Sequence, residues 1–541
     1  MAVQFYSFKR DPLHEEWVGT EPQIAEKEIS EVVETDVLII GAGLAGVAAA
    51  REATERGSQV VIFEKCLIPQ ARSGDFTILD SKIAKRWNRD QIDKKQVVSD
   101  LMHDMGYRVN QNILNAWAEN AGESFDWYLE GYPGLPVLDT TVSPVPEGAN
   151  CWIQPRRYPE PADYSNETEN FKCYQTTVWI RPTHLRVFKG NYALAEKTGR
   201  LKSYFSTPAK KLIKDENGRV IGAIAQKPDG TFIKALARKG VILSTGDYSS
   251  NEKMLAHFCP YVIDAPRLWT SYDRNVRPSN TGDGHRMGVW AGAKMQDSPH
   301  APMGHHMGGA LGASGFLLLN KNGERFVNED CPGQQINNQV NIQPGKMAWQ
   351  IADADWADCV PHITPNHGSV CYVMDEDFDA KSNVNHKLGT IDCFTSQAIV
   401  DKAIADGSMI KADTLDELVD KLGLPKEKAL MEIARYNEMC AQKRDLDFSK
   451  QPKRLFPILK PPFYATKFLP AVMIVCLGGL ESDQYCRCYD ADGNIIKGLY
   501  AAGNVQGDRF SGEYPLTVPG LSHSMALTLG RLAGRYASDE K

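Results

Sequence analysis

The stretch 36–65 limits what this chain can fold into more than any other segment. It opens with Val-Leu-Ile-Ile at 37–40, which is too short and too β-branched for a helix and predicts a buried parallel strand. A glycine-rich turn follows, then a helical pattern from about 44 to 55 that ends at Gly57. The segment 59–63 predicts a second strand. Together these elements predict a βαβ unit and place the chain among the α/β proteins.

Three glycines in this unit, Gly41, Gly43 and Gly46, have the spacing G-x-G-x-x-G. Between a strand and a helix, the first glycine allows a tight turn and the second lets the backbone approach a pyrophosphate, while the third allows the helix to pack closely on the strand. Glu64 ends the second strand, where a carboxylate can accept hydrogen bonds from ribose hydroxyls. A merely structural turn is the alternative, and the complete βαβ context favours a dinucleotide site.

Similar elements are predicted at the other end of the chain. A strand is predicted at 498–503, and its end forms another glycine-rich turn. A helix is predicted farther on, at about 522–536. Helical patterns also occupy 91–130, 415–422 and 426–442. Because dinucleotide-type elements lie at both ends, we expect a second domain inserted between them.

The composition excludes several classes of protein. The formal net charge is −7, from 61 lysines and arginines against 68 acidic residues, which gives no sign of a nucleic-acid surface. Among the 12 cysteines there is no C-x-x-C pair, and Cys486 and Cys488 are expected to be unrelated thiols.

The chain starts without the apolar core of a secretory signal, and its most apolar run, 37–50, is too short to span a membrane. We therefore expect a cytoplasmic protein with no integral membrane segment.

Several motifs outside the first unit carry a resemblance to a known superfamily. They lie at 73–74, 245–247, 281–294, 320–329, 436–448 and 498–504. With the βαβ unit, they resemble the flavoprotein-subunit superfamily of fumarate reductase and succinate dehydrogenase across nearly the whole chain. The resemblance implies FAD as cofactor and a Rossmann-like FAD-binding domain of the glutathione-reductase type with an inserted α+β capping domain. We expect an N-terminal extension at 1–34, the FAD-binding domain at 35–295 and 466–541, and the capping domain at 296–465.

The resemblance also implies which residues bind FAD. Gly503 and Asn504 resemble the element that holds the ribityl chain, and Ser522 and His523 begin the last helix, near flavin O2. The full expected set is Gly41, Ala42, Gly43, Leu44, Ala45, Gly46, Glu64, Lys65, Ser73, Gly74, Asp75, Gly246, Asp247, Gly503, Asn504, Ser522 and His523.

The chain departs from the fumarate reductases of this superfamily at their substrate clamp. Their RFxNE motif continues into Thr-Arg-Asp, whereas the motif at 325–329 continues here as Asp-Cys-Pro-Gly-Gln, without an arginine. Their last helix is preceded by Asn-Arg-Leu-Gly-Gly, whereas 513–520 reads Glu-Tyr-Pro-Leu-Thr-Val-Pro-Gly. Because such cations would hold the two carboxylates, fumarate and succinate are not expected as substrates.

The pair Tyr514-Pro515 indicates a different substrate. The 3-ketosteroid dehydrogenases of the superfamily carry Tyr-Pro-Gly here, and their tyrosine and a backbone N–H hold the 3-keto oxygen. The run 498–527 is most similar to gut-bacterial steroid, bile-acid and cardiac-glycoside reductases. The resemblance implies Tyr514 and Gly520 as catalytic residues that stabilise an enolate oxygen while flavin N5 exchanges hydride at the β-carbon. The expected substrate is a small hydrophobic molecule with a C=C bond conjugated to a ketone, such as a 3-oxo-Δ4 steroid or bile acid.

Two other functions stay open at this point. An enoate reductase acting on an aryl or other acrylate needs a cation at its cavity, which Arg181, Arg186 or Arg274 would supply. A non-catalytic electron-transfer subunit would instead expose a redox edge. The electron donor or acceptor is unknown, as are the reaction direction and the catalytic acid, for which a second tyrosine is one candidate.

The histidines His300, His305 and His306 raise the question of a metal site. Adjacent histidines in a strand point to opposite faces, and a metal needs convergent ligands with a supporting carboxylate or thiolate. We therefore expect no metal, and a structural role or a place at the substrate cavity for these side chains.

Overall fold

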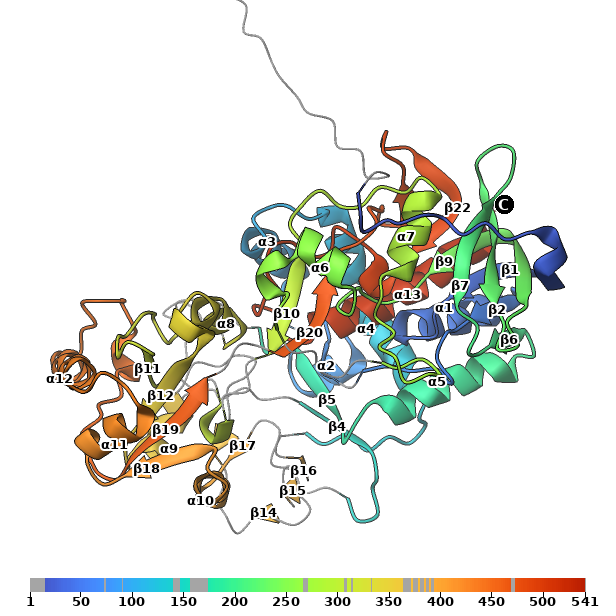
Figure 1. Ribbon diagram of the computed structural model, residues 1–541. Coiled ribbons are helices and arrows are strands. Elements are labelled where there is room, and N and C mark those ends of the chain that lie inside the picture. Colours follow the sequence, from blue (N-terminus) through green and yellow to red (C-terminus); the bar gives the residue numbers. More distant parts are fainter. Residues whose placement is uncertain are drawn as a thin grey trace, which may run out of the picture.

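The computed structural model arranges the chain as two bodies, each built around its own main sheet (Figure 1). The structure describes residues 15–72, 74–89, 91–139, 146–155, 174–265, 271–305, 309–312, 315–331, 333–362, 371–372, 378–379, 384–385, 389–390, 394–468 and 472–540. The larger body contains both the first and the last regular elements of the described chain.

The large sheet contains the βαβ unit that the sequence predicts. Its strands are β1 (Ile29–Ile40), β2 (Val60–Phe63), β6 (Leu201–Tyr204), β7 (Ala209–Lys214), β8 (Val220–Gln226), β9 (Phe232–Leu243), β21 (Arg487–Tyr489) and β22 (Ile495–Ala501). The order is β21-β22-β9-β1-β2-β6, and the hairpin of β7 and β8 pairs with β9. β1 is parallel to β2 and β9, and β22 is parallel to β9. The carboxyl ends of β1, β9 and β22 therefore meet at one edge.

Helices cover both faces of this sheet. They are α1 (Leu44–Glu55), α2 (Lys82–Arg86), α3 (Lys94–Asp104), α4 (Gln111–Leu129), α5 (Leu185–Lys197), α6 (Glu252–Phe258), α7 (Asp283–Trp290) and α13 (Leu521–Asp539). Two glycines of α13 allow it to pack closely on α1. A Cβ on Gly530 would lie 2.5 Å from a carbonyl oxygen of α1, and a Cβ on Gly534 would lie 2.4 Å from another. The last predicted helix thus packs directly on the first.

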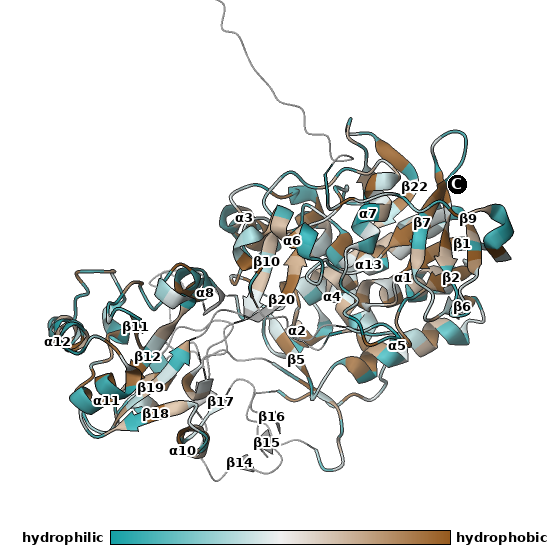
Figure 2. Ribbon diagram, in the orientation of Figure 1, coloured by the Kyte–Doolittle hydropathy of each residue, from teal (hydrophilic) through white to brown (hydrophobic). Residues whose placement is uncertain are grey.

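The alternation of β1 divides the core of the larger body into two. Val37 and Ile39 lie in one buried cluster with residues of α4 and α13, while Leu38 and Ile40 lie in another with residues of β9. All four side chains are at most 3% exposed. Figure 2 shows the strands of this sheet largely in the colour of hydrophobic residues. Burial on both faces explains why the run 37–40 is apolar throughout.

The smaller body has an antiparallel sheet of order β11-β12-β19-β18. Its strands are β11 (Leu317–Asn320), β12 (Ala348–Ala352), β18 (Met409–Ala412) and β19 (Phe463–Phe468). Its helices are α8 (Gly333–Asn341), α9 (Trp356–Cys359), α10 (Gln397–Ala405), α11 (Leu415–Leu422) and α12 (Lys426–Gln442). Both helices expected near its C-terminal end are confirmed. The antiparallel pair of β10 (Ala301–His305) and β20 (Val472–Leu477) lies where the chain enters and leaves this body.

Shorter strands complete the described elements. β3 (Phe76–Thr77), β4 (Trp152–Pro155) and β5 (Thr177–Arg181) form a small sheet. β13 (Cys371–Tyr372) pairs with β17 (Phe394–Thr395), and β14 (Phe378–Asp379), β15 (Val384–Asn385) and β16 (Gly389–Thr390) form a further small sheet. The expected boundary between 465 and 466 falls inside β19, and the division into domains stays a prediction. In the described part of the chain, no helix combines the length and apolar character needed to cross a membrane.

Candidate active site

The first glycine turn links β1 to α1 at the carboxyl edge of the large sheet. Gly41 has a φ of +105°, and a Cβ there would lie 2.5 Å from the Ser244 carbonyl oxygen. A Cβ on Gly46 would lie 2.0 Å from the Gly41 carbonyl oxygen. A Cβ on Gly43 would meet nothing nearer than the Gln70 carbonyl oxygen, at 3.8 Å. Gly41 and Gly46 thus allow the chain to pack on itself, whereas Gly43 borders open space that a pyrophosphate can enter.

The N-terminus of α1 faces this space. Gly43 is the N-cap residue, with an extended backbone and no side-chain cap. The N–H groups of Leu44, Ala45 and Gly46 have no carbonyl partner inside the helix because they belong to its first turn. An anion binds favourably at such a helix end.

Glu64 and Lys65 follow β2 at the same edge. The Glu64 carboxylate accepts hydrogen bonds from the backbone N–H groups of Ala42 at 2.6 Å and Cys66 at 2.7 Å. These contacts hold the carboxylate against the first glycine turn, where the sequence predicts the ribose. The Lys65 ammonium donates to the carboxylate of Asp283, at the start of α7, at 2.8 Å.

The loop after β2 meets the start of α13. A Cβ on Gly74 would lie 2.4 Å from Cε1 of His523, so only glycine fits beside this imidazole. Asp75 is buried next to it in the sequence. Ser73, which the resemblance also assigns to the cofactor, lies outside the described residues. Two segments from opposite ends of the chain thus lie in contact.

Two imidazoles, that of buried His184 and that of partly buried His523, hold the main chain of Arg72, just before this loop. Nε2 of His184 donates to the Arg72 carbonyl oxygen at 2.5 Å, and Nε2 of His523 does so at 3.2 Å. Because a carbonyl only accepts, both rings carry a proton on Nε2, and Nδ1 of His184 accepts from the Tyr128 hydroxyl at 2.7 Å. Burial lowers the pKa of His184 to about 3 and that of His523 to about 4, so both rings are neutral at pH 7. The loop is therefore fixed without adding a charge.

Gly246 and Asp247 follow β9, between the two glycine turns. Gly246 has a φ of +80°. The Asp247 carboxylate accepts hydrogen bonds from the Ser249 N–H at 2.7 Å and from Nδ2 of Asn280 at 2.8 Å. Nη2 of Arg72 lies 3.9 Å from this carboxylate and has no hydrogen-bond partner among the described residues. The carboxylate is therefore held in place by two hydrogen bonds at the edge where the resemblance implies FAD.

The second glycine turn follows β22. Gly503 has a φ of +74°, and a Cβ there would lie 3.0 Å from Cβ of Ala45. The turn therefore lies against the first turn of α1. Oδ1 of Asn504 accepts a long hydrogen bond, 3.5 Å, from Nη2 of Arg509. Both glycine turns thus border the N-terminus of α1.

Tyr514 lies between the second glycine turn and α13, and its side chain is buried. Its hydroxyl oxygen accepts a hydrogen bond from the Ser522 N–H, in the first turn of α13, at 3.1 Å. The phenolic proton is not used in this contact, and burial raises the pKa of Tyr514. Gly520 is the N-cap of α13, where a Cβ would lie 2.7 Å from the carbonyl carbon of Phe76. The phenol is therefore a neutral hydrogen-bond donor held at a helix N-terminus.

This arrangement fits FAD. The helix end at α1 and the open side of Gly43 suit a pyrophosphate, Glu64 suits a ribose, and the turn at Gly503 suits the ribityl chain. Buried polar atoms without a hydrogen-bond partner among the described residues gather at the same edge. They include Oγ1 of Thr245, Nη2 of Arg72 and Nη1 of Arg509. A polar ligand would satisfy such atoms.

Sequence reasoning missed Arg509, His184 and Tyr128. Arg509 lies in the loop between two motifs that were singled out, Asn504 and Tyr514, and an arginine there was the available signal. For His184 and Tyr128 there was no local signal, because their contacts with the loop after β2 arise only in the fold.

Of the three arginines expected as substrate cations, two are exposed and one is buried. Arg186 and Arg274 are exposed, and Arg274 donates to the Pro228 carbonyl oxygen at 3.0 Å. The buried guanidinium of Arg181 lies over the Trp179 ring, 3.6 Å from its centre. Arg72 and Arg509 are two further arginines with a buried guanidinium nitrogen that has no hydrogen-bond partner among the described residues.

The histidine-rich segment gives no sign of a metal site in the described residues. Nδ1 of His300 lies 2.5 Å from the Tyr248 hydroxyl, and its ring is stacked on Phe258 with 4.1 Å between centroids. The His305 side chain and His306 lie outside the described residues. In the described chain, no group of three or more His, Cys, Asp or Glu residues could hold a metal ion.

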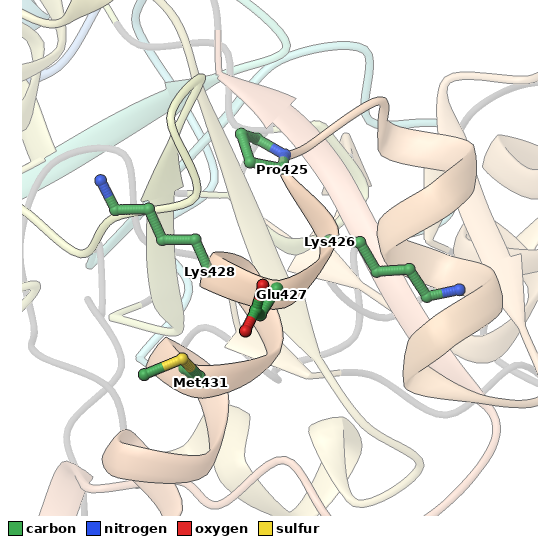
Figure 3. A pocket seen from close by; sticks show the side chains of 5 residues that line it. All are labelled: Pro425, Lys426, Glu427, Lys428 and Met431. Atoms are coloured by element: carbon green, nitrogen blue, oxygen red, sulfur yellow. The ribbon is translucent and has the colours of Figure 1, made fainter.

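A shallow pocket of about 320 Å³ lies on α12 in the smaller body (Figure 3). Its lining consists of Pro425, Lys426, Glu427, Lys428 and Met431. Both lysines are already paired, Lys426 with Asp420 at 2.8 Å and Lys428 with Glu324. The pocket therefore offers no unpaired cation to a ligand.

Comparisons with known proteins agree with the fitted cofactor. A family model described as an FAD binding domain matches residues 36–520. NADH:acrylate oxidoreductase of Vibrio harveyi is 26% identical over 95% of this chain and 51% of its own length, so the chain spans about half of that relative. Digoxin reductase of Eggerthella lenta is 26% identical over 93% of this chain and 86% of its own length.

A solved structure shares the fold. It is the 3-ketosteroid-Δ4-(5α)-dehydrogenase of Rhodococcus jostii RHA1 in complex with 4-androstene-3,17-dione, with a TM-score of 0.68 and 20% sequence identity. The similarity covers 96% of this chain and 100% of that one. The chain therefore belongs to the FAD binding domain family, and it is an FAD-dependent oxidoreductase.

Proposed function

We propose that the protein reduces or introduces a C=C bond conjugated to a ketone, in a steroid- or bile-acid-like substrate of the 3-oxo-Δ4 type. The observation that carries this proposal is the Tyr514 phenol, which is buried, neutral and fixed through its oxygen to the start of α13. A neutral donor of this kind suits the uncharged oxygen of a ketone. The similarity to digoxin reductase supports a bulky, largely apolar substrate.

The chain's own residues supply the electrostatic part of the reaction. FAD, when bound, exchanges a hydride with the substrate through N5. Tyr514 donates its hydroxyl proton in a hydrogen bond to the ketone oxygen and stabilises the negative charge that develops there. The Ser522 N–H donates into the same phenol oxygen, which polarises the O–H bond and strengthens the donor. The backbone N–H of Gly520 is proposed as the second donor.

The variant Tyr514→Phe tests this role. It keeps the ring and removes the hydroxyl, so turnover of a 3-oxo-Δ4 steroid should fall about 10²–10³-fold, or roughly 2.7–4 kcal/mol. The FAD absorbance spectrum should stay unchanged. Tyr192→Phe is the matched control, because that hydroxyl contacts Ser203 at 2.9 Å and should not affect turnover. Turnover at the wild-type rate in Tyr514→Phe would contradict the proposed hydrogen bond from the Tyr514 hydroxyl to the ketone oxygen.

A second candidate is an enoate reductase that acts on an acrylate. It is favoured by the Nη2 atom of Arg72, which lies next to the histidine-held loop without a hydrogen-bond partner among the described residues. The similarity to NADH:acrylate oxidoreductase supports the same candidate. Here Arg72→Met, not Tyr514→Phe, should cause the larger loss of acrylate turnover, because a charge-assisted hydrogen bond to the carboxylate would be lost.

A further inference from the structure

The guanidinium of Arg509 is buried, and no described residue supplies a counter-ion to it. The residue is 1% exposed. Nε donates to the Gln506 carbonyl oxygen at 3.2 Å, and Nη2 contacts Oδ1 of Asn504 at 3.5 Å. Nη1 has no hydrogen-bond partner in the described part of the chain. The ionisable neighbours are the uncharged side chains of Cys486 and Tyr514, with no carboxylate among them.

An isolated buried charge is costly. Burial lowers the pKa of Arg509 to about 10, so the guanidinium still carries its charge at pH 7. Its two hydrogen bonds go to neutral oxygens, which compensate a charge only in part. Buried charges in proteins are normally paired, and removing one partner of a buried pair is strongly destabilising. A ligand that brings negative charge would therefore complete this site.

The surroundings of Arg509 indicate which ligand that is. On one side is Asn504, the residue that the resemblance assigns to the ribityl chain of FAD. On the other is Tyr514, whose hydroxyl is fixed to Ser522 at the start of α13, near the expected position of flavin O2. The guanidinium thus lies between markers of the ribityl chain and of the pyrimidine end of the flavin.

We propose that Arg509 is the counter-ion of reduced FAD and binds the negative charge that the isoalloxazine carries at N1 and C2=O after reduction. A hydride brings two electrons and one proton, so an uncharged isoalloxazine becomes an anion when it accepts one. Arg509 then gains an ionic partner in the reduced state that it lacks in the oxidised state. The protein therefore binds reduced FAD more tightly than a neutral residue would allow, and the midpoint potential of FAD is raised.

The midpoint potential of the FAD-loaded protein tests this role directly. Arg509→Met keeps much of the side-chain volume and removes the charge. We expect at least a tenfold loss of affinity for reduced relative to oxidised FAD, which lowers a two-electron midpoint potential by about 30 mV or more. Arg487→Met is the matched control, since Arg487 is a partly exposed arginine paired with Asp483. Its potential should equal that of the wild type.

Sulfite binding gives a second readout that needs no substrate. Sulfite adds to flavin N5 and leaves a negative charge on the ring, so its affinity should fall about tenfold or more in Arg509→Met. Arg509→Lys keeps the charge, and its potential should stay closer to the wild type than that of Arg509→Met. If the Met variant does not fold, the potential of Arg509→Lys still tests whether a charge at this position matters. An unchanged potential and unchanged sulfite affinity in Arg509→Met would overturn the proposal, as would a potential in Arg509→Lys that falls by a full 30 mV.

Discussion

The core of the smaller body and the loop 503–514 of the larger body differ in whether a buried arginine has an acidic partner. In the smaller body, Arg325 donates to Glu329 at 2.8 and 2.9 Å and to Asp445 at 2.8 and 3.0 Å, and all three side chains are fully buried. In the loop 503–514 of the larger body, Arg509 is equally buried and no carboxylate pairs with it among the described residues. The paired charges of Arg325 stabilise the smaller body, whereas the unpaired charge of Arg509 is proposed to bind a ligand.

Two acids of the same loop reinforce this contrast. Burial raises the pKa of Asp508 to about 7 and that of Glu513 to about 7. The pKa of Asp445, by contrast, is held well below its ordinary value by the Arg325 guanidinium and by backbone N–H groups, against the effect of burial. Ionisable groups with shifted pKa values concentrate at functional sites, which supports the proposed role of the loop 503–514.

The largest effect, loss of bound FAD, is expected from a substitution that blocks the pyrophosphate site. Gly43→Val places a branched side chain in the open space beside α1, and the purified variant should be colourless. Gly43 has an ordinary φ of −78°, so the backbone tolerates the substitution and a folded protein without FAD is expected. Absorbance between 350 and 500 nm, with circular dichroism as the fold control, gives the answer.

Gly43→Ala is the matched variant for this test. Its single methyl group would meet only the Gln70 carbonyl oxygen at 3.8 Å, so more FAD should be retained than in Gly43→Val. A fully yellow Gly43→Val protein would show that the first glycine turn is not the pyrophosphate site.

The next largest effect is expected where the charges are paired. Glu329→Gln removes a carboxylate from Arg325 and leaves Lys450 without its ion pair at 3.4 Å, so the free energy of unfolding of the smaller body should fall by about 3–5 kcal/mol. Urea unfolding followed by tryptophan fluorescence measures this. Glu417→Gln breaks an exposed pair with Lys421 and should change stability little. Equal effects of the two variants would show that the buried pairs of Glu329 stabilise the smaller body no more than an exposed pair does.

The smallest effect is a difference in pH dependence. Because the folded pKa of Glu513 is raised to about 7, the folded protein keeps a proton that the unfolded chain releases above about pH 4.3. Glu513 therefore costs stability as the pH rises through this range. The melting temperature of Glu513→Gln, relative to the wild type, should increase from pH 5 to pH 8.

Asp445→Asn is the counterpart in the smaller body. The lowered pKa of Asp445 adds stability that is fully present above the unfolded pKa of about 3.9 and is lost only as the pH falls further. Its melting-temperature deficit should therefore stay constant from pH 5 to pH 8. A deficit that changes across this interval, or a pH-independent Glu513→Gln, would contradict the assignment of paired and unpaired acids.

Local signals made much of the fold predictable. The βαβ unit at 36–65 and the helices at 415–422 and 426–442 follow from apolar periodicity, glycine position and strand length, which act over a few residues. The glycine turn at 41–46 also has a local cause, since two of its glycines are required by backbone contacts.

The rest of the site could not be predicted because it depends on contacts between distant segments. The Arg72 carbonyl oxygen accepts hydrogen bonds from His184 and His523, and only the packing of α5 and α13 around the loop brings these side chains together. Burial of Arg509 likewise depends on the contact of the loop 503–514 with the start of α13, which is distant from the other motifs in sequence. Residue type alone also does not show whether an arginine is buried. Arg186 and Arg274 were expected as cations at the cavity, and both are exposed in the fold.

The most direct test of the proposed chemistry uses reduced enzyme without any electron partner. Anaerobic, photoreduced protein is mixed with 3-oxo-Δ4 steroids, other enones, acrylates and fumarate, and the return of oxidised flavin absorbance is followed with time. The account predicts rapid reoxidation by one or more enones and none by fumarate, with Tyr514→Phe slowing the enone reaction about 10²–10³-fold. Reoxidation by an acrylate or fumarate, with every enone inert, would contradict it.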